Sequence, residues 1–186
     1  MDLFEALRTR RSIGKLAGDV TDGEIRELVE AALWAPNHRL TEPWRFTVLR
    51  GAARERLGRA WAALVAGETP LDVERREALA SREAGKPLRA PVVIAASVRT
   101  DPDPVVADED FAATAAAVQN LLLAAHARGL GAIWRTGGMA YRREIREHLG
   151  LDAGDRIVAF IYLGRPAMDP PQARPRSLDG ILRFSE

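Results

Sequence analysis

The spacing of apolar residues divides the chain into helices and a smaller number of short strands. A period near 3.6 residues predicts helices over residues 2–10, between Thr21 and Pro36, and over 52–66, 73–83, 108–128 and 141–149. Short apolar runs predict strands over residues 44–49, 91–98, 132–136 and 157–163. Because these elements do not form regular strand–helix–strand units, the pattern predicts an α+β fold in one domain spanning residues 1–186.

Helix boundaries are clearest between Thr21 and Pro36. Thr21 and Glu24 have the spacing of a capping box, and the proline ends the helix. Its apolar stripe consists of Ile25, Leu28, Val29, Ala32 and Leu33. The first helix has Leu3, Phe4 and Leu7 on one side, and the expected core face of 52–66 is Leu57, Trp61 and Leu64. We interpret the charged stretch from Gly67 to Pro91 as a candidate flap over a site, with a helix around 73–83.

The helix over residues 108–128 is apolar on almost every side from Phe111 to Ala127. Such a helix must be buried all round, and its Ala112–Ala117 segment is small enough for another backbone to approach closely. We interpret it as a central helix packed against a second copy of the chain. A central helix of a monomer is the alternative. The tail after Pro166 is polar, yet docking on a partner would cover its apolar residues Ile181, Leu182 and Phe184.

Composition narrows the chemistry that the side chains can perform. With no cysteine among 186 residues, disulfides, thiolate metal sites and cysteine nucleophiles are excluded. His38, His126 and His148 lack ligand-like spacing, so no metal site is predicted. Neither a Walker A motif, a Rossmann fingerprint nor a Gly-x-Ser-x-Gly elbow occurs. We therefore expect no catalytic side chain and assign the chemistry to a cofactor.

Charge and hydropathy argue against large anionic partners. The formal net charge is only +1, which gives no electrostatic basis for binding nucleic acid or a membrane surface. No signal peptide is visible after Met1, and no run of about 18 apolar residues predicts a membrane span. The expected location is therefore cytoplasmic.

Arg10, Arg11 and Ser12 follow the first helix and are the candidate phosphate ligands. A phosphate monoester carries roughly −1.5 to −2 charges near neutral pH. Two neighbouring guanidiniums and a hydroxyl form a suitable clamp for such a group. The alternative is a solvated basic helix end, where arginines favourably face the helix dipole.

Several short motifs extend this clamp into an ordered pattern. After Arg10-Arg11-Ser12 come Ala35-Pro36, Pro43-Trp44-Arg45-Phe46, Gly129-Leu130-Gly131, Trp134-Arg135-Thr136-Gly137 and Tyr162-Leu163-Gly164-Arg165-Pro166. Their order and spacing resemble the FMN-dependent nitroreductase superfamily over nearly the whole chain, and the short length is similar to its compact bacterial branch of NAD(P)H nitroreductases. The resemblance implies a central, mostly antiparallel sheet flanked by helices. It also implies a homodimer with FMN at the subunit interface and a C-terminal tail that extends onto the partner.

The same resemblance implies a set of residues for the phosphate end of FMN. Arg10 and Ser12 would hold phosphate and ribityl oxygens, with Arg11 beside them. Arg174 and Arg176 would complete the clamp, unless they belong to a simple solvated tail.

The flavin ring has its own implied neighbours. Trp34 and His38 would reach it from the other subunit, unless Trp34 is ordinary core. Trp134, Arg135 and Thr136 would run along the isoalloxazine edge, unless that strand end packs into the core.

Two positions depart from the family pattern. Gly14 stands where a cation is frequent, so Lys15 or another cation would have to stabilise the reduced ring. Glu42 replaces the glutamine that often precedes Pro-Trp.

The activity implied by the resemblance is an NAD(P)H oxidoreductase. Hydride would pass from NAD(P)H through FMN to a small electron-poor acceptor, such as a nitroaromatic or a quinone, in a ping-pong reaction. One alternative keeps the flavin but changes the reaction to that of a dehydrogenase, dehalogenase or flavin-consuming enzyme. Another is a non-catalytic FMN-binding module, which would show no hydride transfer.

Overall fold

The computed structural model describes residues 1–68 and 72–185. Within these ranges one antiparallel sheet is formed by β1 (Leu16–Ala17), β2 (Trp44–Arg50), β3 (Val92–Val98), β4 (Gly131–Arg135) and β5 (Arg156–Pro166). The strand order is β1-β5-β3-β2, and β4 also pairs with β5. The four predicted strands are confirmed. The short β1 was not predicted, because two residues carry no periodic signal.

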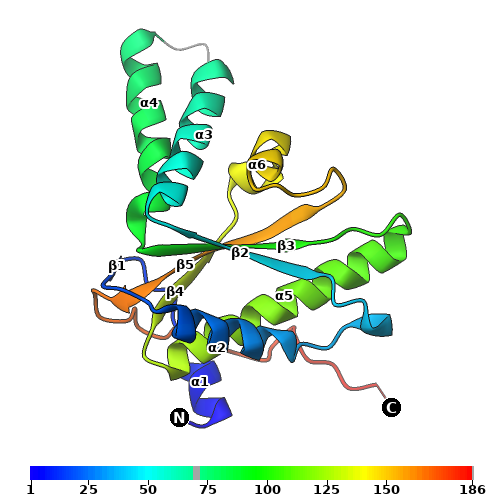
Figure 1. The fold of residues 1–186 in the computed structure, drawn as a ribbon. Helices are drawn as coiled ribbons and strands as arrows, with labels where there is room; N and C mark the ends of the chain where they lie inside the picture. The colour runs from blue at the N-terminus through cyan, green and yellow to red at the C-terminus, as the bar shows by residue number, and fades with distance from the viewer. Residues whose placement is uncertain (69–71, 186) are drawn as a thin grey trace.

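Helices cover both faces of the sheet (Figure 1). They are α1 (Leu3–Thr9), α2 (Asp22–Leu33), α3 (Ala52–Glu68), α4 (Val73–Gly85), α5 (Pro104–Ala127) and α6 (Arg143–His148), with short 3-10 turns η1 (His38–Leu40), η2 (Lys86–Arg89) and η3 (Gly138–Tyr141). Helices α2 and α5 pack on one face, whereas α3 and α6 pack on the other. The predicted α+β architecture, with an antiparallel sheet flanked by helices, is confirmed.

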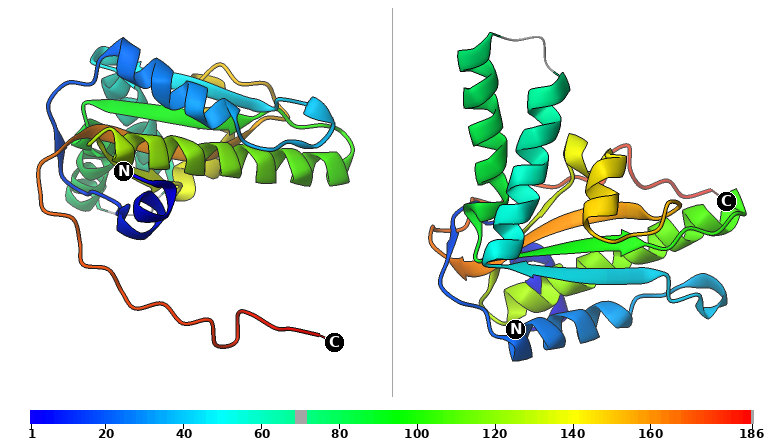
Figure 2. Two further views of the ribbon diagram at one scale, coloured as in Figure 1. Left: turned by 90° about the horizontal axis from the view of Figure 1, so that it is seen from below. Right: turned by 45° about the horizontal axis from the view of Figure 1, so that its top comes forward.

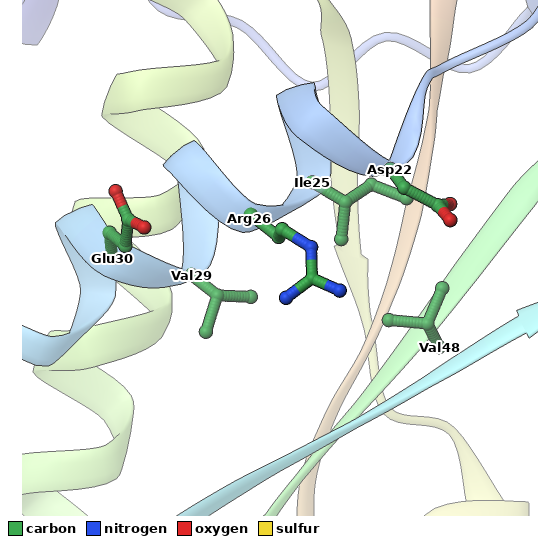
Figure 3. Close-up of a pocket in the computed structure, with 6 residues that line it drawn as sticks. All are labelled: Asp22, Ile25, Arg26, Val29, Glu30 and Val48. Atoms are coloured by element: carbon green, nitrogen blue, oxygen red, sulfur yellow. The ribbon is translucent and has the colours of Figure 1, made fainter.

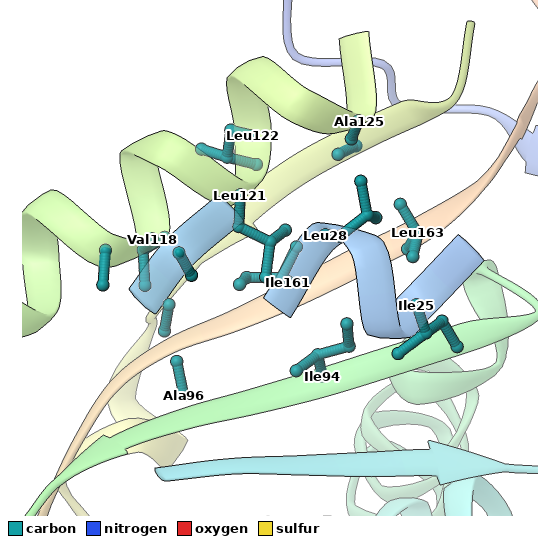
Figure 4. Close-up of a cluster of buried hydrophobic side chains, with 14 of the residues drawn as sticks. Ile25, Leu28, Ile94, Ala96, Val118, Leu121, Leu122, Ala125, Ile161 and Leu163 are labelled. Atoms are coloured by element: carbon teal, nitrogen blue, oxygen red, sulfur yellow. The ribbon is translucent and has the colours of Figure 1, made fainter. Parts of the chain in front are cut away.

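The two central strands explain why their sequences are almost continuously apolar. Side chains alternate between the faces of a strand. Ile94 of β3 and Ile161 of β5 therefore pack against α2 and α5, where Leu28 and Leu121 meet them (Figure 4). Their neighbours along the strands enter the second cluster, and Phe160 there meets Trp61 of α3 edge to face, with ring centroids 5.3 Å apart. Both faces of these strands are thus buried.

The predicted capping box of α2 is present. The Thr21 amide donates to Glu24 Oε2 at 2.8 Å, and the Glu24 amide donates to Thr21 Oγ1 at 3.2 Å. Ile25, Leu28 and Ala32 of the predicted stripe are buried, but Leu33 is 49% exposed. At about 100° per residue, Leu33 lies roughly 140° around the helix from Leu28, so it leaves the core.

Helix α5 begins earlier than the pattern predicted. The pattern placed its start at residue 108, whereas the helix starts at Pro104. Proline is favourable in the first helical turn, where its missing amide is not needed. Asp103 caps the helix by accepting the Val105 amide at 2.9 Å. In this single chain the face of α5 around Ala112 stays exposed.

Helices α3 and α4 form a hairpin that projects from the sheet (Figures 1 and 2). The predicted helix around 73–83 is confirmed as α4, and Leu57 and Trp61 of α3 are buried as predicted. Residues 69–71 of the candidate flap lie outside the described residues. The role of this hairpin as a flap stays a prediction.

The tail beyond β5 leaves the body of the molecule and runs beside it in an extended path (Figure 2). Its apolar residues find no cover on this chain, since Ile181 is 79% exposed and Phe184 is 85% exposed. The apolar side of α1 is similarly bare, with Phe4 68% exposed. Several large apolar side chains therefore remain in contact with solvent when the chain is alone.

Gly58 of α3 fixes the close approach of α3 and α4. A Cβ atom at this position would lie 2.3 Å from the backbone oxygen of Ala84. We expect Gly58→Ala to destabilise the fold by about 1–3 kcal/mol, because the hairpin must open to admit the methyl group. The matched control is Gly67→Ala on the same helix, where a Cβ meets no atom of the described residues within 4 Å.

That control should stabilise the protein by up to about 1 kcal/mol, the usual effect of replacing a helical glycine. Urea unfolding followed by circular dichroism measures both changes. Equal shifts for the two variants would contradict the proposed packing constraint.

Candidate functional site

The structure brings the predicted phosphate residues together at one cleft, here called the arginine cleft. Its volume is about 840 Å³, and it is lined by Leu7, Arg8, Arg10, Arg11, Ser12, Gln172, Ala173, Arg174, Pro175 and Arg176. Among the residues that the structure describes, five arginines line it and no carboxylate does. Arg8 and Gln172 were not singled out from the sequence. Arg8 lies less than one helical turn before Arg11, so helical spacing could have indicated it.

The end of α1 arranges this cleft. The Arg11 guanidinium donates through Nη1 to the carbonyl oxygens of Arg8, at 2.7 Å, and Arg10, at 2.8 Å. It thereby satisfies carbonyl groups that a helix C-terminus leaves without partners. Arg11 thus helps to shape the cleft, while Arg10 and Ser12 present their side chains along it.

Positive charge is concentrated at this helix end. The pKa of Arg10 lies below its ordinary value, mainly because its side chain is partly buried and secondarily because the charged Arg11 is its neighbour. An arginine nevertheless stays protonated in proteins, so the like charges persist. His126 Nε2 lies 2.8 Å from Thr9 Oγ1. The pKa of His126 lies below its ordinary value, mainly because the ring is partly buried and secondarily because Arg10 and Arg11 are positively charged. The imidazole is therefore neutral near pH 7 and joins α5 to α1 without adding charge.

A backbone bridge links the arginine cleft to β4. Ser12 and Ala132 form an isolated parallel bridge, and the Ile13 amide donates to the Ala132 oxygen at 3.1 Å. Gly131 permits this approach, because a Cβ there would lie 2.6 Å from Leu16 Cδ2. From Ala132 to Thr136 an extended chain spans roughly 13 Å. The predicted ring-contact segment therefore begins beside the cleft and runs away from it.

That segment lines a second cleft of about 590 Å³, here called the aromatic cleft, between the foot of the α3–α4 hairpin and β4. It is lined by Trp61, Val65, Leu79, Arg82, Glu83, Lys86, Arg89, Trp134, Arg135, Thr136, Gly137, Gly138, Met139 and Tyr162. Arg135 and Thr136 are therefore at a cleft surface. Trp134 is half-buried and also packs against the core, so the core alternative for it holds in part.

Tyr162 in the aromatic cleft was missed by the sequence reasoning as a site residue. It was taken as part of an apolar strand and of the last motif in the ordered pattern, yet its ring lies under Arg135, with Cζ 5.6 Å from the ring centroid. The residue is only 2% exposed. Burial raises the pKa of Tyr162 to about 12, despite opposing effects of Arg135 and Arg89. Its hydroxyl therefore remains a hydrogen-bond donor at neutral pH.

Trp34 and His38 line neither cleft. Trp34 is 87% exposed, so the alternative that it belongs to the core of this chain is wrong. His38 Nδ1 lies 2.7 Å from Glu109 Oε2 of α5, beside an open hollow that includes Ala112. The structure therefore separates these two predicted residues from the arginine cleft of the same chain.

The two departures from the motif pattern also have defined surroundings. Gly14 has open space where a side chain would project, and the Lys15 oxygen accepts the Ala167 amide at 3.0 Å. Glu42 has φ 42°, and its amide donates to Asn37 Oδ1 at 3.0 Å. Lys15 is exposed, so its ammonium is available to a ligand.

One further groove, of about 430 Å³, lies between α2 and β2 (Figure 3). It is lined by Asp22, Ile25, Arg26, Val29, Glu30 and Val48. Two carboxylates and one guanidinium line it, and none of the predicted site residues does. Among residues 1–68 and 72–185, no group of three histidines or carboxylates could hold a metal ion. No described helix combines the length and apolarity needed to cross a membrane.

Comparison with known proteins defines the family. The chain matches the model of the nitroreductase family over residues 7–165. It is 32% identical over 177 residues to the Bacillus subtilis protein named "Putative NAD(P)H nitroreductase YfhC", covering 94% of this chain and 89% of that protein. The chain therefore belongs to the nitroreductase family, as the motif order predicted.

Solved structures agree with this assignment. A nitroreductase-like family protein from Bacillus cereus superposes with a TM-score of 0.88 at 30% identity, covering 100% of this chain and 97% of the other. A nitroreductase described as putative, from Desulfovibrio desulfuricans and in complex with FMN, gives a TM-score of 0.71 at 29% identity. That comparison covers 98% of this chain and 96% of the other. The nitroreductase-like fold is thus confirmed.

The burial of Tyr162 has a measurable consequence at alkaline pH. Only two tyrosines occur in the chain, so tyrosinate absorbance near 295 nm resolves them individually. We expect one ionisation at about pH 12 that is missing from Tyr162→Phe. Because the folded pKa lies above the unfolded value, the protonated hydroxyl favours folding below about pH 10, and this contribution is lost as the pH rises through about 12.

The measurement requires that the protein remain folded, which circular dichroism at each pH establishes. A folded parent protein in which both tyrosines ionise near pH 10 would contradict the raised pKa of Tyr162.

Proposed function

We propose that this protein is an FMN-dependent NAD(P)H oxidoreductase of the nitroreductase type that acts as a homodimer. The observation that carries the proposal is the arginine cleft, with five arginines and a serine but no carboxylate along its wall. A doubly charged phosphate matches this excess of cations. The FMN complex of a structural relative supports the same cofactor, and the name of the Bacillus subtilis relative supports NAD(P)H as the hydride donor.

The residues present fit the two ends of FMN. Arg10, Ser12, Arg174 and Arg176 would hold the phosphate, with Arg11 shaping the cleft around it. Segment Trp134–Thr136 would hold the ring edge with backbone groups, because no described strand pairs with the far side of this part of β4. Gly137 adopts φ 61° and has open space beside its Cα. A flat ring could therefore approach this backbone closely.

In this proposal the chain supplies binding, orientation and exclusion of water. The redox chemistry would come from the bound flavin, which accepts hydride from NAD(P)H and then reduces an electron-poor acceptor such as a nitroaromatic or quinone. Backbone amides of residues 134–137 would orient the ring and offer fixed dipoles to its polar edge. No side chain is required as a general acid, because an open cleft admits solvent.

The proposed dimer accounts for the apolar side chains that this chain leaves bare. Phe4, Trp34, Ile181 and Phe184 are each more than 60% exposed. A face of small residues on α5 adjoins His38 along the hollow that contains Ala112. Packing a second copy there would bury these groups and bring Trp34 and His38 to the partner's flavin.

The phosphate clamp is tested with Arg10→Ala. We expect FMN affinity to fall by about 1.5–3 kcal/mol, the scale of a hydrogen bond to a charged group. Flavin fluorescence titration measures the dissociation constant, and Arg56→Ala on the exposed side of α3 serves as the matched control. Unchanged FMN affinity in Arg10→Ala would refute the clamp. Flavin loading without oxidation of NADH or NADPH would refute the reductase.

The dimer is tested with Ala112→Trp. Ala112 is exposed in the single chain, so the substitution should leave the monomer folded while blocking close approach of a second α5. We expect sedimentation to change from twice the chain mass to the chain mass, with loss of bound FMN. The control is Ala153→Trp, in an exposed turn before β5. An Ala112→Trp monomer that keeps full flavin affinity would contradict a site shared between subunits.

A further inference from the structure

The aromatic cleft carries more positive charge than the proposed flavin site uses. Arg82, Lys86, Arg89 and Arg135 line it together with one carboxylate, Glu83. Glu83 is only 4% exposed and is already engaged. Its carboxylate lies 2.6 Å from Lys86 Nζ and 3.5 Å from Arg82 Nη2.

Two arginines are left over by this pairing. Among the described residues, neither Arg89 nor Arg135 forms an ion pair. Arg135 is held over the ring of Tyr162 by a cation–π contact, with Cζ 5.6 Å from the centroid. Both cations are close enough to Tyr162 to influence its ionisation. Both guanidiniums line the same cleft as Tyr162.

The Tyr162 hydroxyl is the third donor. In the part of the chain that the structure describes, no hydrogen bond to this hydroxyl is present, although the residue is 2% exposed. The hydroxyl is not among the buried side-chain atoms that lack a partner, so it faces the cleft rather than the protein interior, and a ligand atom that accepts its hydrogen bond can replace water there. The cleft therefore offers two guanidiniums outside ion pairs and one hydroxyl, three groups that can donate hydrogen bonds to the oxygens of an anion.

We propose that Arg89, Arg135 and Tyr162 form a subsite for the anionic oxygens, carboxylate or phosphate, of a substrate whose flat ring lies against Trp134–Gly137. This inference rests on the proposed function, since that segment is the proposed flavin edge. Guanidiniums bind carboxylate and phosphate with paired hydrogen bonds. The volume of about 590 Å³ suits a small molecule. Trp61 and Met139 provide apolar wall for its remaining surface.

Either reactant could supply this group. Pyridine nucleotides carry phosphates, and many electron-poor aromatic acceptors carry a carboxylate. The shared chemistry is an anionic oxygen group attached to a planar ring. The two half-reactions of the flavin-loaded protein separate these sources, because reduction by the nucleotide and reoxidation by the acceptor are measured independently.

The test compares Arg89→Gln with Arg59→Gln, which removes the same charge from an exposed part of α3. Stopped-flow reduction of flavin-loaded protein by NADH and NADPH gives the donor dissociation constants. Reoxidation by 4-nitrobenzoate and by the neutral 4-nitrobenzyl alcohol gives the acceptor constants. We expect Arg89→Gln to weaken one anionic reactant by about ten-fold, the effect of losing one charge-assisted hydrogen bond.

If only the dissociation constants of NADH and NADPH change, the subsite binds the phosphates of the hydride donor. If instead the preference for nitrobenzoate over the alcohol falls, the subsite binds the carboxylate of the acceptor. Equal constants in Arg89→Gln and Arg59→Gln for every reactant would overturn the subsite while leaving the flavin enzyme intact. Failure to bind FMN at all would instead defeat the proposed function.

A second measurement does not depend on turnover. Trp61 and Trp134 line the cleft, so saturable quenching of tryptophan fluorescence by 4-nitrobenzoate reports binding there. We expect 4-nitrobenzoate to bind more weakly to Tyr162→Phe and to Arg89→Gln than to the parent protein. The neutral 4-nitrobenzyl alcohol should bind to all three proteins with similar affinity. Nitrobenzoate affinity that is the same in all three proteins would contradict the subsite.

Discussion

The repulsion among arginines at the end of α1 is the constraint on which the rest of the site depends. Arg10 and Arg11 adjoin each other, and the cleft they line contains no carboxylate to neutralise them. Folding holds them there because Arg11 closes the end of α1 and because Ser12 is tied to Ala132. In the absence of a bound anion, the free energy gained by packing the rest of the chain offsets this repulsion. Such a site is preorganised for a ligand with high charge density.

The location of the site follows from how the sheet is buried. β3 and β5 are buried along most of their length, so a ligand has room beside them at β4 rather than over the centre of the sheet. β4 instead pairs with β5 and, on its far side, meets only the extended chain near Ser12 among the described residues. Beyond that bridge the backbone groups of β4 lack a strand partner, and such a bare sheet edge can pair with another chain. In the proposed holoenzyme they become the contacts of the cofactor ring.

The sequence was sufficient where local chemistry determines structure. The capping box at Thr21, the strands and the arginine–serine motif each depend on neighbours a few residues away. It was insufficient where tertiary packing decides. Tyr162 looks like one more residue of an apolar strand, and only the register of β4 on β5 brings Arg135 over it. Trp34 extends an apolar helix stripe, yet it projects into solvent because the helix ends there.

The separation of Trp34 and His38 from their own arginine cleft has a consequence for how this family member would assemble. If these residues serve a flavin, that flavin must sit on another copy of the chain, since neither residue lines a cleft with Arg10. Cofactor binding and dimerisation would then be linked equilibria. The ligand would stabilise the dimer, and the bare apolar surfaces of α1, α5 and the tail would be covered only when both subunits are present. Assembly and cofactor retention would therefore rise together with protein concentration.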